Sequence, residues 1–388
     1  MPIGFQKHSR RVIRIVGLLW ICMSLMACSS ATVHKVFDNL HLTAGEVHTA
    51  EVGYPNELER AAEDYVLPEQ YLYDDSLKST SKLLQASGTA GMVIIHEGKI
   101  VYENYGYGKN QNSRFLAWSV SKSVTSALVG IAIDEGFINE VTDPVVKYVP
   151  ALQSTAYADS TIEHVLEMAS GVQFDETYNL GTDISRLQQA VGRDLSHEIQ
   201  QYKVLDHPPG TFNEYKSIDT VVLGMILVNA TGQSVTSFLQ SRLWEPAGMS
   251  GEATWLADRN GLEGAFCCLQ ATLRDWAKFG LIYLNNGFYN NQQIIPQQWV
   301  SASLDTSKPH QQPGKNPLSD DEWGYGYQWW IPDAGNDYAA VGVFNQFIYV
   351  NPDVNLVIVK GSGALSYLIN DREDEHIALF RAISRDFH

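Results

Sequence analysis

The stretch Trp118-Ser119-Val120-Ser121-Lys122-Ser123 decides how the rest of this 388-residue chain is interpreted. It holds a Ser-x-x-Lys tetrad, and apolar residues follow it at helical spacing over 120–135. Gly136 stands where a helix C-cap belongs. The pattern therefore predicts a helix that Ser119 opens. Lys122, three residues later, would lie on the same face, with the serine hydroxyl at the positive end of the helix.

The same tetrad occurs a second time, at Ser79-Thr80-Ser81-Lys82, so the pattern alone is weak. That copy lies in a polar stretch, whereas 115–118 and two following valines surround Lys122 with apolar side chains. Serine enzymes that form acyl intermediates use this tetrad. A lysine base must lower its pKa from about 10.4 by roughly three units, and burial is the main means. The context favours a catalytic pair at Ser119 and Lys122, with a helix cap and a surface lysine as the alternative.

A Pro/Gly turn over 208–211 leads to Tyr215 and then to an apolar helix predicted from residue 220. A tyrosine at the apex of a loop can act as a second acid or base. Packing is the alternative role, since Tyr215 is one of 19 tyrosines. The residues alone favour packing.

Strand patterns occur near both ends of the chain and helical patterns between them. Residues 91–105 read as a tight hairpin around Glu97-Gly98. The middle of the chain, about 137–320, predicts amphipathic helices, including 161–169, 220–229, 235–243 and 273–285. Strands are predicted at 325–331, 347–350 and 356–360, and a last helix at 371–385. The expected fold class is α+β, an antiparallel sheet flanked by helices.

The domain organisation follows from the same patterns. Residues 61–388 are expected to form one catalytic domain. Its α/β lobe would comprise 61–117 and 321–388, the two chain ends, and a mainly helical lobe would be inserted over 118–320.

The first 27 residues read as an export signal, with four basic residues and a short apolar run. The run ends in Leu25-Met26-Ala27-Cys28, which resembles the lipobox of bacterial lipoproteins. That resemblance implies lipidation of Cys28 and, because Ser29 follows, an outer-membrane anchor facing the periplasm. A transmembrane anchor is the alternative, although the run is short for the roughly 20 residues that a span needs. Residues 28–60 are polar and are expected to form a tether.

Composition excludes several classes of function. Acidic residues outnumber basic ones 44 to 27, for a net charge of −17, so neither nucleic acid nor an anionic membrane surface is an expected partner. No metal-ligand or nucleotide-binding motif occurs, so no cofactor is expected. The adjacent pair Cys267-Cys268 is expected to be two buried thiols, because neighbouring cysteines bridge only with a strained backbone.

Taken in order, five segments resemble the serine β-lactamase and penicillin-binding superfamily, and within it the class C and esterase-like branch and the 6-aminohexanoate-dimer hydrolase group. The resemblance runs from about Gly91 to the C-terminus. The segments are Trp118 to Ser123, Met168-Ala169-Ser170-Gly171-Val172, 209–217, 271–280 and 324–330.

The resemblance implies a role for each residue of an acyl-transfer site. Ser119 would be the nucleophile, Lys122 its base and Tyr215 the acid/base relay. Ser217, which stands where class C enzymes usually carry an asparagine, and Gly342 would help to bind the substrate. The backbone N–H groups of Ser119 and Val343 would hold the oxyanion, with Gly342 beside Val343 at an edge strand.

Three more residues, Glu176, Tyr178 and Trp330, are candidates for the lining of a substrate cleft. Packing or loop positions explain them equally well.

One segment departs from the family pattern. Ala340-Val341-Gly342 stands where the family has Lys-Thr-Gly or His-Thr-Gly, so the cation and hydroxyl that help to bind a β-lactam are missing. The expected activity is therefore hydrolysis of a small ester or linear amide through a covalent acyl-enzyme. Two alternatives stay open. One is a catalytically silent lipoprotein that binds cell-wall peptide or a protein partner, and the other is a true β-lactamase or D-Ala peptidase.

Overall fold

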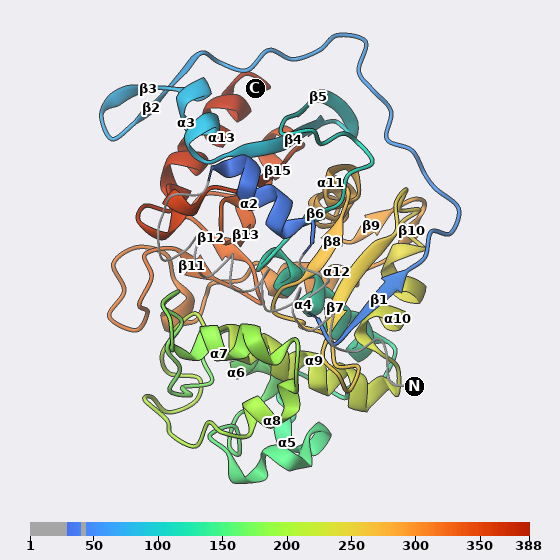
Figure 1. The fold of residues 1–388 in the computed structure, drawn as a ribbon, viewed down its shortest axis with the longest axis vertical. Helices are drawn as coiled ribbons and strands as arrows, with labels where there is room; N and C mark the ends of the chain where they lie inside the picture. Colours follow the sequence, from blue (N-terminus) through green and yellow to red (C-terminus); the bar gives the residue numbers. More distant parts are fainter. Residues whose placement is uncertain (1–28, 40–43) are drawn as a thin grey trace, which may run out of the picture.

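A computed structural model describes residues 29–39 and 44–388. Within them, a seven-stranded antiparallel sheet occupies one half of the molecule (Figure 1). Its strands come from both parts of the chain expected to build it. Their order is β11 (Gly324–Tyr325), β12 (Trp330–Ile331), β13 (Tyr338–Gly342), β14 (Gln346–Asn351), β15 (Leu356–Ser362), β4 (Thr89–His96) and β5 (Lys99–Tyr105). The predicted α+β fold class is confirmed.

The predicted hairpin is formed by β4 and β5. Glu97 and Gly98 connect the strands with φ of 48° and 77°, the left-handed conformations of a two-residue hairpin turn. β15 pairs with β4 on its other side, from Leu356 opposite His96 onward. This pairing joins the C-terminal strands to the N-terminal hairpin.

Helices cover both faces of the sheet. α13 (Glu373–Arg385) buries Ile377, Phe380 and Ile383 in an apolar cluster with side chains of β4, β14 and β15. On the opposite face α11 (Leu273–Leu284) contacts β4, β14 and β15, and α4 (Val120–Asp134) contacts β13 and β14. α4 is buried almost along its whole length, which places its first turn inside the molecule.

The other half of the molecule is mainly helical (Figure 1). α9 (Ser217–Thr231) is its central helix and contacts α4. Around it lie α5 (Val145–Tyr148), α6 (Ile162–Leu166), α7 (Asp183–Ala190), α8 (Leu195–Ile199) and α10 (Val235–Leu239).

The segment 118–320 is not all one helical lobe, because α11 packs on the large sheet and two strands lie within a second sheet. That sheet has the order β1 (Glu46–Ala50), β7 (Ala253–Ala257), β8 (Leu269–Ala271) and β6 (Phe115–Leu116). The remaining elements are β2 (Gln70–Tyr73), β3 (Ser76–Ser79), α3 (Thr80–Ala86), β9 (Phe288–Tyr289), β10 (Gln292–Gln293) and α12 (Gln297–Ser303).

The structure corrects the expected tether at 28–60. Residues 30–37 form α2 (Ser30–Phe37), whose Val33, Val36 and Phe37 are buried, and β1 pairs with β7. Val36 and Phe37 lie three and four residues after Val33 and so share its face of the helix, although the stretch reads as polar overall. The signal segment 1–27 and Cys28 lie outside the described residues.

Two further expectations differ from the structure. The strand predicted at 325–331 is divided into β11 and β12, because Gln328 takes a left-handed φ of 65° in the turn between them. Cys267 and Cys268 form a disulfide, not two thiols. Cys268 has a left-handed φ of 78°, so the backbone at this position departs from the ordinary conformation that keeps neighbouring cysteines apart.

No single helix in the described part of the chain is long and apolar enough to cross a membrane. The bent pair of Ser217–Thr231 and Val235–Trp244 meets the criterion jointly, by length and composition only.

Candidate active site

Ser119 occupies the N-cap position of α4, as the sequence predicts. Its side chain makes no capping hydrogen bond to the helix backbone, so its hydroxyl remains available for another partner. The residue is 9% exposed. Trp118 before it has a left-handed φ of 49°, a conformation that non-glycine residues adopt only when their surroundings hold them there.

The amine of Lys122 is buried against the hydroxyl of Ser119. Lys122 is 1% exposed, and its Nζ lies 2.8 Å from Ser119 Oγ and 3.1 Å from Ser217 Oγ. A third hydrogen bond, of 3.0 Å, goes to the backbone oxygen of Phe266. Burial lowers the pKa of Lys122 to about 7, while the charge of Glu176 acts in the opposite direction. The surface-lysine alternative is therefore wrong.

Ser217 links this amine to a partly buried carboxylate. The first residue of α9, Ser217 donates its hydroxyl to Glu176 Oε1 at 2.6 Å and its amide to Oε2 at 2.8 Å. Burial raises the pKa of Glu176 to about 6, and Lys122 and the bonds from Ser217 oppose that rise. The two groups thus hold pKa values close to each other near neutrality.

The ring of Tyr215 lies over the same amine. Lys122 Nζ is 4.8 Å from the centre of the Tyr215 ring. Burial and the charge of Glu176 raise the pKa of Tyr215 well above its usual value, and a hydrogen bond with Ser119 acts against them. The phenol is therefore protonated at neutral pH and can donate. Trp330 stacks on the ring at 5.2 Å and Tyr325 meets it edge-on at 5.9 Å, which fixes its orientation.

The end of β13 approaches the start of α4 backbone to backbone. A Cβ on Gly342 would lie 2.5 Å from the oxygen of Ala117 and 3.1 Å from the nitrogen of Ser119, so only glycine fits. Among residues 29–39 and 44–388, neither the amide of Ser119 nor that of Val343 has a hydrogen-bond acceptor. Two free donors thus lie on adjoining backbone segments, as an oxyanion site requires.

The predicted edge strand is an edge only in part. β12 lies beside β13 in the sheet but pairs with it at Ala339 alone, so among the described residues 340–342 have a strand partner on one side only, β14. The short length of β12 leaves this end of β13 free to face the serine.

The structure also places the cleft candidates. Tyr178 donates its hydroxyl to Glu176 Oε1 at 3.4 Å, and Trp330 lies on Tyr215, so both adjoin the cluster. The structure brings together nine of the predicted site residues: Ser119, Lys122, Tyr215, Ser217, Glu176, Tyr178, Trp330, Gly342 and Val343. The second tetrad is not part of this cluster, because Lys82 is exposed and, among the described residues, the hydroxyl of Ser79 hydrogen-bonds only that of Ser81, at 3.1 Å.

The backbone oxygen of Phe266 is the contact that sequence reasoning missed. It accepts a bond from Lys122 across 144 positions of sequence, and a backbone carbonyl leaves no pattern in side chains that could reveal it. The segment holds α4 at two more points, since Thr125 Oγ1 donates to the oxygen of Ala265 and the amide of Leu269 donates to Ser121 Oγ. The lysine is thus positioned by a strap over α4.

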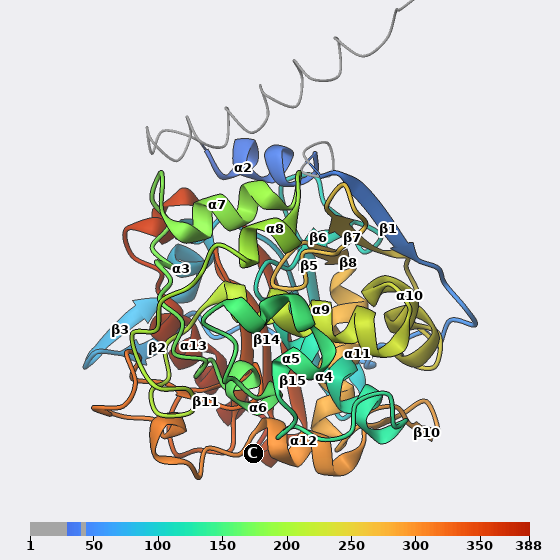
Figure 2. The same ribbon diagram turned by 90° about the horizontal axis from the view of Figure 1, so that it is seen from below.

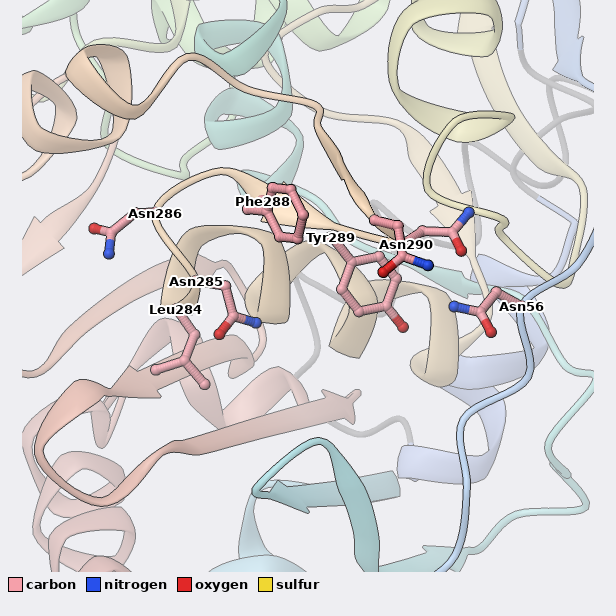
Figure 3. Close-up of a pocket in the computed structure, with 8 residues that line it drawn as sticks. Asn56, Leu284, Asn285, Asn286, Phe288, Tyr289 and Asn290 are labelled. Carbon is pink, nitrogen blue, oxygen red and sulfur yellow. The ribbon is translucent and has the colours of Figure 1, made fainter.

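Two other observations concern possible sites elsewhere among the described residues. No group of three or more His, Cys, Asp or Glu side chains among them could hold a metal ion. A groove of 710 Å³ beside β9 and β10 is lined by asparagines, Leu284, Phe288 and Tyr289 (Figure 3). It contains no nucleophile paired with a base, and none of the residues of the Ser119 cluster lines it.

Comparisons with known proteins bear on the family and the fold of the chain. The 6-aminohexanoate-dimer hydrolase of Paenarthrobacter ureafaciens is 27% identical over 302 residues, 73% of this chain and 75% of that protein. A putative 6-aminohexanoate-dimer hydrolase from Bacillus anthracis has a TM-score of 0.76 at 23% identity and covers 90% of this chain and 93% of that one. EstCE1, a hydrolase with promiscuous acyltransferase activity, has a TM-score of 0.63 at 15% identity, with 78% and 96% covered.

The two structural likenesses are below 25% identity and therefore show the fold, which is the one that the sequence motifs implied. The Beta-lactamase family model matches residues 79–368, most of the chain and the whole of the Ser119 cluster. The chain therefore belongs to the Beta-lactamase family, among the homologues of 6-aminohexanoate-dimer hydrolase.

Proposed function

We propose that this protein is a serine hydrolase that cleaves an ester or a linear amide through a covalent acyl-enzyme. The observation that carries the proposal is the 2.8 Å approach of Lys122 Nζ to Ser119 Oγ, with the amine buried and its pKa lowered to about 7. A neutral amine beside a hydroxyl at the start of a helix is the arrangement that activates a serine without histidine.

In the first step, Ser119 Oγ attacks the substrate carbonyl while Lys122 Nζ takes the hydroxyl proton. The carbonyl oxygen becomes an oxyanion that the amides of Ser119 and Val343 receive. Tyr215 then donates its phenolic proton to the leaving alkoxide or amine, and the C–O or C–N bond breaks. The proton on Lys122 returns to the Tyr215 phenolate, which leaves the lysine neutral and Ser119 acylated.

In the second step, water attacks the acyl-enzyme with the same groups in the same roles. Lys122 takes a proton from the water, and the oxyanion forms again between the two amides. The bond to Ser119 Oγ then breaks as Tyr215 donates its proton to that oxygen, and the proton on Lys122 returns to the Tyr215 phenolate. Ser217 contacts the amine of the base directly, and Glu176 acts on that amine through Ser217 and through its own charge. They hold the amine in place and adjust its pKa.

The substrate class is proposed from the site and from the names of the relatives. Ala340 and Val341 offer neither the cation nor the hydroxyl that would bind the carboxylate of a β-lactam, and the cluster beside Ser119 is aromatic. The relatives are named a 6-aminohexanoate-dimer hydrolase and a hydrolase with promiscuous acyltransferase activity. We therefore favour a small ester or a linear amide and expect little nitrocefin hydrolysis.

A fluorophosphonate probe and a chromogenic short-chain ester test the proposal. We expect labelling and turnover in the wild type, loss of both in Ser119→Ala, and wild-type levels in Ser79→Ala, the matched change in the other tetrad. An unlabelled and inactive wild type would favour the silent binding protein. Rapid nitrocefin hydrolysis would favour the β-lactamase.

For the N-terminus we propose a lipid anchor on Cys28, after cleavage of residues 1–27, with the catalytic body on the periplasmic side of the outer membrane. The support is the sequence Leu25-Met26-Ala27-Cys28-Ser29. Labelling with radioactive palmitate in cells, followed by membrane fractionation, tests it. Cys28→Ala should abolish the label, and a labelled Cys28→Ala protein would contradict the proposal.

A further inference from the structure

Phe37, at the end of helix α2, contacts two aromatic side chains, each from a residue next to one of the two residues with free amides. Its ring lies 5.2 Å from the Trp118 ring and 5.2 Å from the Phe344 ring, measured between centroids. Those two rings are 5.4 Å apart, so the three form a closed cluster, here called the ring cluster. All three residues are at least 94% buried.

Each partner of Phe37 adjoins one of the amide donors. Trp118 immediately precedes the amide of Ser119, and Phe344 immediately follows Val343. Both partners have left-handed backbones, with φ of 49° and 68°. Such conformations are uncommon for bulky non-glycine residues, and the ring cluster is packing that these two residues share.

Contacts apart from Phe37 dock α2 on the body. His34 Nε2 hydrogen-bonds the oxygen of Gly88 at 2.9 Å, and its ring lies 2.8 Å from the position that a Cβ on Gly363 would take. Asp38, just after the helix, pairs with Lys109. Figure 2 shows α2 at the outer surface of the molecule, so the helix packs on the outside of the fold and is not one of its central elements. Loss of the Phe37 ring would therefore leave the helix anchored at other points.

We propose that Phe37 is a positioning residue for the oxyanion site. Its ring holds Trp118 and Phe344 together, and with them the two amides that receive the negative oxygen. The inference rests on the proposed acyl-transfer function. It assigns a role in catalysis to a segment that the sequence marks only as a polar tether. Oxyanion donors act at short, fixed distances, so a small shift of either amide weakens the transition state more than the bound substrate.

The test compares Phe37→Ala with Phe37→Tyr, which keeps a ring, and with Val33→Ala, which removes another buried side chain from the same helix. For a chromogenic ester we expect kcat to fall roughly 10- to 100-fold in Phe37→Ala, with KM within about twofold of wild type. Affinity for a boronic acid, which mimics the tetrahedral intermediate, should fall by the same factor. Phe37→Tyr should recover most of the kcat, and Val33→Ala should stay near wild type.

Two results would overturn the positioning role. One is a rise in KM at unchanged kcat, which would make Phe37 a wall of the substrate pocket. The other is an equal loss of kcat in Val33→Ala, which would mean that docking of the helix, not the ring, matters. If Phe37→Ala does not fold, Phe37→Leu replaces it. Smaller losses of kcat and of affinity for the boronic acid are then expected. A wild type that fluorophosphonate does not label would instead refute the acyl-transfer function itself, and this inference with it.

Discussion

Ser217 donates both its hydroxyl and its backbone amide to the carboxylate of Glu176, at 2.6 and 2.8 Å. The same hydroxyl lies 3.1 Å from Lys122 Nζ, so a single side chain separates the carboxylate from the amine. Burial pushes the amine toward its neutral form and the carboxylate opposes it. The pKa of Lys122 is the balance of these two effects, and the predictions below depend on it.

The pH dependence of turnover should follow the amine. Lys122 must be unprotonated to take the proton of Ser119, and its pKa is about 7. We therefore expect kcat/KM for an uncharged ester to be low below pH 6, to rise through about pH 7 and to level off above pH 8. A profile that is flat from pH 5 to pH 9 would contradict a lysine base.

The same lowered pKa affects stability. Between the native pKa of about 7 and the unfolded value of about 10.4, the unfolded chain binds a proton at this lysine that the native protein does not. The contribution of this residue to the free energy of unfolding therefore rises with pH across that window. Urea titrations at pH 7, 8 and 9 should show a smaller rise in Lys122→Met than in the wild type.

Glu176→Gln should move the acid limb of the pH profile to lower pH, because the negative charge that raises the pKa of Lys122 is gone. Its plateau should also fall, roughly 10-fold, since the Gln amide can replace only one of the two acceptors that Ser217 uses. Rate profiles from pH 4.5 to 9 measure both effects. Glu375→Gln, a partly buried acid on α13, is the control and should leave the limb in place. A limb shifted upward would show that Glu176 does not act on the amine through its charge.

Lys122→Met should reduce kcat about 10²- to 10⁴-fold while the fold is retained, because the thioether side chain fills the buried space but cannot take a proton. Circular dichroism checks the fold and ester hydrolysis checks the rate. Lys82→Met is the matched control, since it makes the same change in the tetrad that is exposed. Turnover within tenfold of wild type in Lys122→Met would remove this lysine from the mechanism.

Much of the fold and the centre of the site could be predicted, since they rest on local patterns. The helix after Ser119, the hairpin around Gly98 and the strands at 346–351 and 356–362 each show their own periodicity or turn residues. The apolar neighbours of Lys122 predicted its burial, and the residue is 1% exposed, whereas Lys82 is exposed.

What could not be predicted depends on contacts that are distant in sequence. Glu176 and Ser217 are each candidates from the sequence, but they are 41 residues apart and no local pattern indicates that they bind each other. Phe266 contributes a backbone oxygen, which any residue carries. The docking of α2 depends on buried side chains and polar contacts within a stretch that is polar overall, and these contacts can be recognised only when the surface that receives them is known.

Gly342→Ala should damage catalysis through the backbone alone. The added Cβ would lie 2.5 Å from the oxygen of Ala117, and because both sides of the contact are main chain, β13 or the start of α4 must move. We expect kcat to fall roughly 10²-fold, as for loss of one oxyanion donor, and the free energy of unfolding to fall by about 1–3 kcal/mol. Gly106→Ala is the control, since its Cβ would meet nothing closer than the oxygen of Thr89 at 3.5 Å. Ester hydrolysis and urea unfolding measure the two effects. A Gly342→Ala protein with full kcat would mean that the amides of Ser119 and Val343 are not where the oxyanion binds.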